Sequence, residues 1–217
     1  MTRARIGRIL AAILILVLAS FAKHSVGYQG MPSRLLPSLV LWIVFFGYWA
    51  YASRNSAPTQ SSESWGSTYL HQGALAVALF LLYLPVPGLN GWFIPERFQF
   101  PVVIGGIVQV LGLLLAVWAR RHLGRNWAAE VRIGVDHELV RTGPYRWIRH
   151  PIYTAMLTMF LGTAIASSQY HALLGVAILF VAYIRKTRLE EEILSRTFPT
   201  DYDAYRKATW RLVPPVF

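Results

Sequence analysis

Long apolar runs alternate with short polar segments along most of the chain. A helix needs about 20 mostly apolar residues to cross the hydrocarbon core of a bilayer. Four runs approach or meet this length by themselves, over residues 6–22, 35–53, 69–84 and 100–119. The pattern therefore predicts an all-α protein, a polytopic transmembrane helical bundle.

A fifth apolar stretch, residues 152–184, is too long for one crossing. It is interrupted at residues 167–171 by the polar cluster Ser-Ser-Gln-Tyr-His, which is typical of a tight turn between helices. We expect a helical hairpin made of two short crossings, each of about 15 residues. With the four preceding runs this gives about six crossings.

The basic residues fall unevenly among the connecting segments. Segments 1–8, 54–68, 120–150 and 185–217 together carry 18 of the 21 lysines and arginines. Six crossings place these four segments on one side, and the positive-inside rule makes that side the cytoplasm. We therefore expect an integral, multi-pass protein with both termini cytoplasmic, in a membrane such as the prokaryotic inner membrane.

This topology divides the chain into two parts. Residues 1–119 are expected to form N-terminal transmembrane helices, and residues 120–217 a catalytic region with the hairpin and cytoplasmic C-terminal helices. The first 22 residues also imitate a secretory signal, because basic residues precede an apolar run that ends in Ser-Phe-Ala. We expect a retained first helix, with cleavage as the alternative.

Composition supports the membrane assignment and excludes several kinds of site. Hydrophobic residues make up 55% of the chain and charged residues 14%, against about 25% charged in a typical soluble domain. The net charge of +11 lies beside apolar runs, so lipid headgroups rather than nucleic acid are the expected partner. The chain has no cysteine, which excludes disulfides, thiolate metal ligands and a cysteine nucleophile. No metal-ligand spacing is present, and we expect no metal site.

The densest group of chemically useful residues is segment 137–153, His-Glu-Leu-Val-Arg-Thr-Gly-Pro-Tyr-Arg-Trp-Ile-Arg-His-Pro-Ile-Tyr. Gly143-Pro144 predicts a turn, and Pro151 suits the first position of a helix. Arg149 and His150 should therefore lie at the mouth of the first hairpin helix, where free N–H groups suit an anion. The alternative is ordinary membrane anchoring, in which Arg and His reach the headgroups and Tyr and Trp form an interfacial belt.

A second group follows the last crossing, where Arg188 precedes a run of three glutamates. A carboxylate here could bind ribose hydroxyls or an ammonium group, and the alternative is a solvated helix end with weak Arg–Glu pairs. Pro199 should stop this helix. Tyr202 and Tyr205 should then share one face of a short amphipathic helix at the membrane interface.

At these residues the chain resembles the isoprenylcysteine carboxyl methyltransferase family of integral membrane enzymes. The resemblance runs from about residue 118 to 214. It rests on the His-x-Leu-Val run, Gly-Pro-Tyr, Arg-His-Pro-x-Tyr, the paired glutamates and Phe198 followed by two tyrosines. Ala155 and Pro199 depart from glycines common in the family, and both bear on pocket shape.

The resemblance implies methyl transfer from S-adenosylmethionine to a lipophilic substrate, possibly the carboxylate of an isoprenylcysteine-like molecule. It implies that Arg188, or second to it Arg185, faces the substrate. Such a substrate would enter sideways from the bilayer, and we expect a route between residues 100–119 and the hairpin. The cofactor would contact residues drawn from His137, Glu138, Leu139, Val140, Tyr145, Arg149, His150, Pro151, Ile152, Tyr153, Glu191 and Glu192, with Glu191 favoured over Glu192.

Three alternatives remain at this stage. A phospholipid, or a small lipophilic amine or thiol, could replace the carboxylate as methyl acceptor. A sterol-reductase-like enzyme would share the His-Pro-x-Tyr motif but use NADPH, and such proteins are generally longer. A non-enzymatic membrane protein would bind neither cofactor. The sequence leaves the acceptor and the oligomeric state open.

Overall fold

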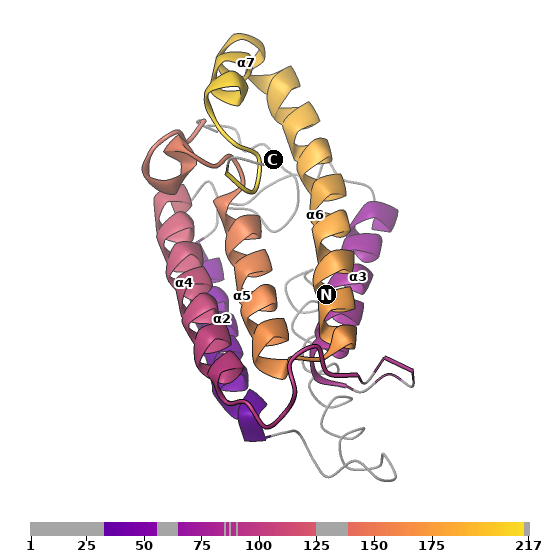
Figure 1. The fold of residues 1–217 in the computed structure, drawn as a ribbon. Helices are drawn as coiled ribbons and strands as arrows, with labels where there is room; N and C mark the ends of the chain where they lie inside the picture. The colour runs from indigo at the N-terminus through magenta and orange to yellow at the C-terminus, as the bar shows by residue number, and fades with distance from the viewer. Residues whose placement is uncertain are drawn as a thin grey trace.

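Helices dominate the regular structure of the described part of the chain (Figure 1). The structure is a computed structural model that describes residues 33–55, 65–84, 86, 88–89, 91–124 and 139–214. Within these ranges it has six α-helices, three short 3₁₀ helices and two isolated β-bridges. The elements are η1 (Ser33–Leu35), α2 (Leu36–Ala52), η2 (Ser53–Asn55), α3 (Trp65–Tyr83), α4 (Phe100–Leu123), η4 (Gly143–Arg146), α5 (Pro151–Ser167), α6 (Tyr170–Thr197) and α7 (Pro199–Ala208).

The apolar runs of the sequence correspond to helices. The runs at 35–53, 69–84 and 100–119 become α2, α3 and α4, whereas residues 6–22 lie outside the described residues. Among the described helices, α4 alone is both long and apolar enough to cross a membrane by itself. Helices α2 and α5 are apolar but have 17 residues each, slightly fewer than the about 20 of a standard crossing.

The predicted helical hairpin is present in the structure. Helix α5 ends at Ser167, and Ser168 takes the left-handed backbone conformation, with a φ of 58°, that reverses the chain into α6. The loop before α4 holds this turn, because the N–H of Phe93 donates to the carbonyl of Ser168 at 2.9 Å. Helix α6 has 28 residues, so it continues well beyond the apolar run that ends near residue 184.

Helices α4 and α5 are in backbone contact. A Cβ atom added to Gly105 would lie 2.3 Å from the carbonyl oxygen of Gly162, and one added to Gly112 would lie 2.8 Å from that of Ala155. Small residues permit this approach in membrane helices. The expected lipid route between residues 100–119 and the hairpin is wrong on the α5 side, because no tail can pass between touching backbones.

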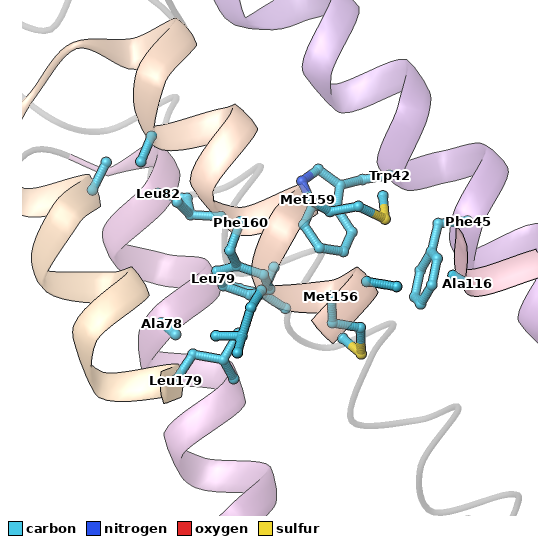
Figure 2. Close-up of a cluster of buried hydrophobic side chains, with 14 of the residues drawn as sticks. Trp42, Phe45, Ala78, Leu79, Leu82, Ala116, Met156, Met159, Phe160 and Leu179 are labelled. Atoms are coloured by element: carbon cyan, nitrogen blue, oxygen red, sulfur yellow. The ribbon is translucent and has the colours of Figure 1, made fainter. Parts of the chain in front are cut away.

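Side chains from α2 to α6 meet in one apolar core (Figure 2). Trp42 of α2 packs edge-on against Phe160 of α5, with ring centroids 5.0 Å apart. Its indole N–H donates to the hydroxyl of Thr163 at 3.1 Å, and this hydroxyl lies 3.0 Å from that of Ser38. These hydrogen bonds satisfy the indole N–H and the two hydroxyl groups, which have no water to bond to inside the apolar core.

Candidate functional site

A buried stripe on α6 leads from the apolar core to a charged cluster. Leu179, Tyr183, Thr187 and Glu191 follow one another at spacings of four residues, and all four are buried. Residues four apart lie on one helix face, so the stripe that packs in the core reappears, one turn at a time, beyond the apolar segment. The helix thereby carries Glu191 into the protein although its neighbour Glu192 is exposed.

Glu191 is the centre of this cluster. Its Oε1 accepts hydrogen bonds from Arg149 Nε at 2.9 Å and Arg211 Nε at 3.1 Å, and lies 3.3 Å from His150 Nε2. Its Oε2 accepts from Arg211 Nη2 at 2.7 Å. The Glu191 side chain is 5% exposed, so these cationic groups replace the water that a buried carboxylate would lose.

His150 lies between two carboxylates. Its Nδ1 is 3.2 Å from Glu190 Oε2, on the ring edge opposite Glu191, and Tyr153 donates its hydroxyl to the other oxygen of Glu190. Pro151 begins α5, as predicted, so His150 and Tyr153 are placed at the start of that helix. Two helix termini that are distant in sequence thus supply one compact set of acids and cations.

The segment 209–212 after α7, hereafter the strap, closes the cluster. It runs beside residues 147–150: the N–H of Arg149 donates to the carbonyl of Trp210 at 2.8 Å, and the N–H of Trp210 donates to that of Trp147 at 2.9 Å. Helix α7 leads directly into the strap, and its Tyr202 and Tyr205 share a buried face as predicted. This face packs on the protein rather than on a membrane surface, since the Tyr205 hydroxyl donates to the carbonyl of Tyr145 at 2.7 Å.

A hollow of about 410 Å³ opens beside Glu191, within the range of about 300–1,000 Å³ usual for small-ligand sites. Arg188 lines the hollow and has no ion-pair partner among the residues that the structure describes. On α7, the Tyr202 hydroxyl is buried and makes no hydrogen bond to the described residues. The lining residues are Arg188, Glu191, Glu192, Ser195, Arg196, Arg206 and Arg211.

The remaining predicted residues are distributed around this centre. Glu192 is exposed and pairs with Arg196 at 2.5 Å, one helical turn away. Arg185 points to α3, where it donates to the Ser67 hydroxyl at 2.8 Å, and it does not line the hollow. Leu139 and Val140 are half-buried ahead of η4, Tyr145 and Pro151 are buried, and Ile152 is half-buried; His137 and Glu138 lie outside the described residues.

Comparisons with known proteins find similarity to methyltransferases. A family model described as phospholipid methyltransferase matches residues 100–201. Protein-S-isoprenylcysteine O-methyltransferase A of Arabidopsis thaliana is 25% identical over 191 residues, which cover 83% of this chain and 93% of that protein. The Saccharomyces cerevisiae protein-S-isoprenylcysteine O-methyltransferase is 27% identical over 75% of this chain and 71% of its own length. Over most of its length the chain is thus similar to isoprenylcysteine O-methyltransferases.

Two further similarities are partial. The nickel-cobalt-cadmium resistance protein NccN of Alcaligenes xylosoxydans xylosoxydans is 34% identical over 110 residues, and the matched part is 48% of that protein. A solved structure of the eukaryotic intramembrane Ras methyltransferase, isoprenylcysteine carboxyl methyltransferase, aligns with 94% of this chain and 60% of its own at 19% identity, with a TM-score of 0.46. The full-length similarities and the family model together support a membrane methyltransferase.

Sequence reasoning missed two residues of this cluster, Glu190 and Arg211. For Glu190 a signal was present in α6, because Tyr183, Lys186 and Glu190 follow one another at helical spacings of three and four residues, and the first two are buried. No comparable signal marks Arg211. It reaches Glu191 only because the strap folds back beside residues 147–150.

The charges of the cluster shift the pKa values of Glu191 and His150 in opposite directions. Burial raises the pKa of the Glu191 carboxyl, but hydrogen bonds from His150, Arg211 and Arg149 outweigh burial and hold this pKa well below its usual range. Burial lowers the pKa of His150, but hydrogen bonds and the charges of Glu190 and Glu191 outweigh burial and raise it. Both groups are thus held charged beside one another.

These shifts predict how the methyltransferase's stability depends on pH. The Glu191 contribution is present above about pH 4.3 and is lost as pH falls, and the His150 contribution is present below about pH 6.5 and is lost as pH rises through the raised pKa. We expect the stability difference between wild type and His150→Gln to shrink from pH 6 to pH 9 in detergent unfolding measurements. A difference that stays constant over that range would contradict the protonated, doubly paired imidazole.

Proposed function

We propose that this protein transfers the methyl group of S-adenosylmethionine to the carboxylate of a lipophilic acceptor at the cytoplasmic face. The observation that carries the proposal is Arg188, a cation without an ion-pair partner among the described residues, in a hollow next to the buried acid cluster. An isoprenylcysteine-like carboxylate is the favoured acceptor, as in the relatives named above.

The membrane arrangement is part of the proposal. We infer six crossings, with the charged cluster and hollow on the cytoplasmic side together with both termini, because that side holds 18 of the 21 basic residues. Residues 1–119 would then anchor the protein, and residues 120–217 would carry its chemistry. A lipophilic acceptor would leave its tail in the bilayer and present only its head to the hollow.

The residues present fit S-adenosylmethionine. Its ammonium and ribose hydroxyls need acceptors, its methionine carboxylate needs cations, and all of these types meet at the hollow. We infer that Glu190 is the better acceptor of the acid pair, since each of its oxygens has one partner, whereas Glu191 Oε1 has three close donors. The Tyr202 hydroxyl, buried without a partner, offers one more polar contact.

The other residues predicted to contact the cofactor would surround it as follows. Tyr145, Pro151, Ile152 and Tyr153 would shape the pocket wall, with His137, Glu138, Leu139 and Val140 on the preceding segment. We infer that Arg149, His150 and Glu191 hold this wall in position rather than bind the cofactor, because they already form ion pairs with one another. Bound S-adenosylmethionine supplies an electrophilic methyl group on a sulfonium ion.

The charge of the hollow favours a carboxylate acceptor over an amine. Four arginines and two glutamates line it, and both glutamates already have arginine partners. An acceptor amine would find no glutamate in the lining that lacks an arginine partner, whereas a carboxylate can pair with Arg188 through two parallel hydrogen bonds. A carboxylate is also a nucleophile that needs no general base, so this chain has only to orient the acceptor and exclude water.

The test is methyl transfer by purified protein in lipid, with a prenylated cysteine carboxylate and phosphatidylethanolamine as alternative acceptors. We expect transfer to the carboxylate, and we expect Arg188→Ala to raise its KM about tenfold or more, since a charged hydrogen bond is worth about 1.5–3 kcal/mol. Arg196→Ala is the matched control, because Arg196 lines the same hollow but is already paired with Glu192.

Calorimetry with S-adenosylhomocysteine separates the cofactor from the acceptor. Arg188→Ala should bind this product as wild type does. Transfer to the phospholipid amine and not to the carboxylate would support the phospholipid alternative. A folded protein that binds a nicotinamide dinucleotide but no S-adenosylhomocysteine would overturn the proposal.

A further inference from the structure

Three tryptophan side chains are half-exposed at the α7 end of the bundle, and they are hereafter the tryptophan platform. Trp118 lies near the end of α4, Trp147 follows η4, and Trp210 belongs to the strap; their exposed fractions are 42%, 53% and 45%. The rings of Trp118 and Trp147 have centroids 6.1 Å apart. Tryptophan with one apolar and one polar side is enriched where a membrane meets water.

The platform continues a surface that is already suited to lipid. On α4, exposed apolar residues recur at spacings of three and four and lead directly to Trp118: Val103, Ile107, Leu111 and Leu114. This is the described helix that is long and apolar enough to cross a bilayer. A lipid-facing stripe that ends in tryptophan marks the depth at which the hydrocarbon gives way to headgroups.

Basic side chains accompany the platform. The guanidinium of Arg146 lies 5.8 Å from the centre of the Trp147 ring, and Arg121 is exposed one turn beyond Trp118. Arginine beside an interfacial tryptophan suits the phosphates of anionic lipids. The occupant that these observations favour is therefore a headgroup layer rather than a second protein.

The strap connects this platform to the buried cluster. Along residues 210–212, Trp210 is turned outward, Arg211 binds Glu191, and Leu212 is completely buried. Trp210 and Arg211 are adjacent on a segment whose backbone is paired with residues 147–150, so the position of Trp210 and that of Arg211 depend on each other. Holding the outer residue fixed would hold the inner one on Glu191.

We propose that the tryptophan platform lies in the lipid headgroup layer and that this contact holds the strap, and with it Arg211, against Glu191. The inference rests on the membrane arrangement of the proposed function. The position of Arg211 in the charged cluster would then depend on contact between the platform and the lipid headgroups. The site would be complete only when the protein is embedded in a bilayer.

Fluorescence quenching tests the location of the platform. The full chain is reconstituted in nanodiscs whose lipids carry bromine either near the headgroup end or near the tail end of the acyl chain. The control is the triple variant Trp118→Phe, Trp147→Phe, Trp210→Phe. The fluorescence of the platform is the wild-type emission minus the emission of this variant. We expect bromine near the headgroup to quench this emission more strongly. Quenching by aqueous iodide and by neither lipid would overturn the proposal.

Hydrogen exchange in the same nanodiscs tests the link to the cluster. The amides of Arg149, His150 and Trp210 donate in the strap pairing, and Trp210→Ala should speed their exchange about tenfold, with Trp210→Phe close to wild type. Tyr51→Ala is the control, because Tyr51 is an exposed aromatic at the end of α2 with no bond to the strap. Unchanged exchange in Trp210→Ala would refute the link. Binding of S-adenosylhomocysteine by wild type is measured separately, so the proposed function and this inference can fail independently.

Discussion

Replacing Glu191 with glutamine is expected to lower the free energy of unfolding by about 3–5 kcal/mol, because it leaves buried cations without their counter-charge. Arg149, His150 and Arg211 all bind this one carboxylate, and the side chains of Arg149 and His150 are almost completely buried. The loss should extend beyond stability. With Arg211 released, the strap loses its anchor, so we also expect binding of S-adenosylhomocysteine to fall by more than tenfold.

Glu192→Gln is the matched control for this prediction. Glu192 is the next residue on the same helix, but its side chain is 57% exposed and it pairs with an exposed arginine. Exposed pairs of this kind contribute about 0.3–0.5 kcal/mol. Unfolding in detergent, followed by circular dichroism, should therefore separate the two variants clearly. Equal stability of Glu191→Gln and Glu192→Gln would show that Glu191 is not the centre of the cluster.

The second large effect is expected at the contact between α4 and α5. Gly105→Leu should destabilise the fold by about 3 kcal/mol or more, at or above the upper end of overpacking costs. Even the first side-chain atom would lie 2.3 Å from the carbonyl of Gly162 and 2.6 Å from the backbone nitrogen of Ala166. Backbone atoms cannot rotate away as a side chain can, so the two helices would have to separate. Because α5 begins at Pro151, next to His150, separation should also disturb the charged cluster.

The adjacent glycine provides an unusually close control. A Cβ added to Gly106 meets nothing within 4 Å, so Gly106→Leu adds an apolar side chain on an open surface. Leucine also favours the helix over glycine by up to about 1 kcal/mol. We expect Gly106→Leu to be as stable as wild type or slightly more so, by thermal unfolding in detergent. A Gly105→Leu variant with the same midpoint would mean that α4 and α5 do not touch at this place.

Much of this architecture follows from local sequence properties. The apolar runs at 35–53, 69–84 and 100–119 are long enough to form helices without help from partners, and the structure has helices there. The polar cluster at 167–171 and Pro199 break helices by their own chemistry, and the chain turns at both. The family resemblance could also be recognised from the order and spacing of the motifs, because each motif is a short continuous stretch of sequence.

Tertiary structure alone decided which of these residues act together. Consecutive glutamates 190–192 are chemically identical in the sequence, yet the 100° step between helical residues sends 190 and 191 inward and 192 to solvent. The distance between Glu191 and Arg211 is 20 residues along the chain but 2.7 Å in space, because the strap returns beside residues 147–150. Nothing in the sequence likewise separates Gly105 and Gly112, which touch α5, from Gly106, which does not. Local sequence patterns determine where the helices begin and end. Which side chains contact one another depends on how those helices pack, and the candidate site consists of such contacts.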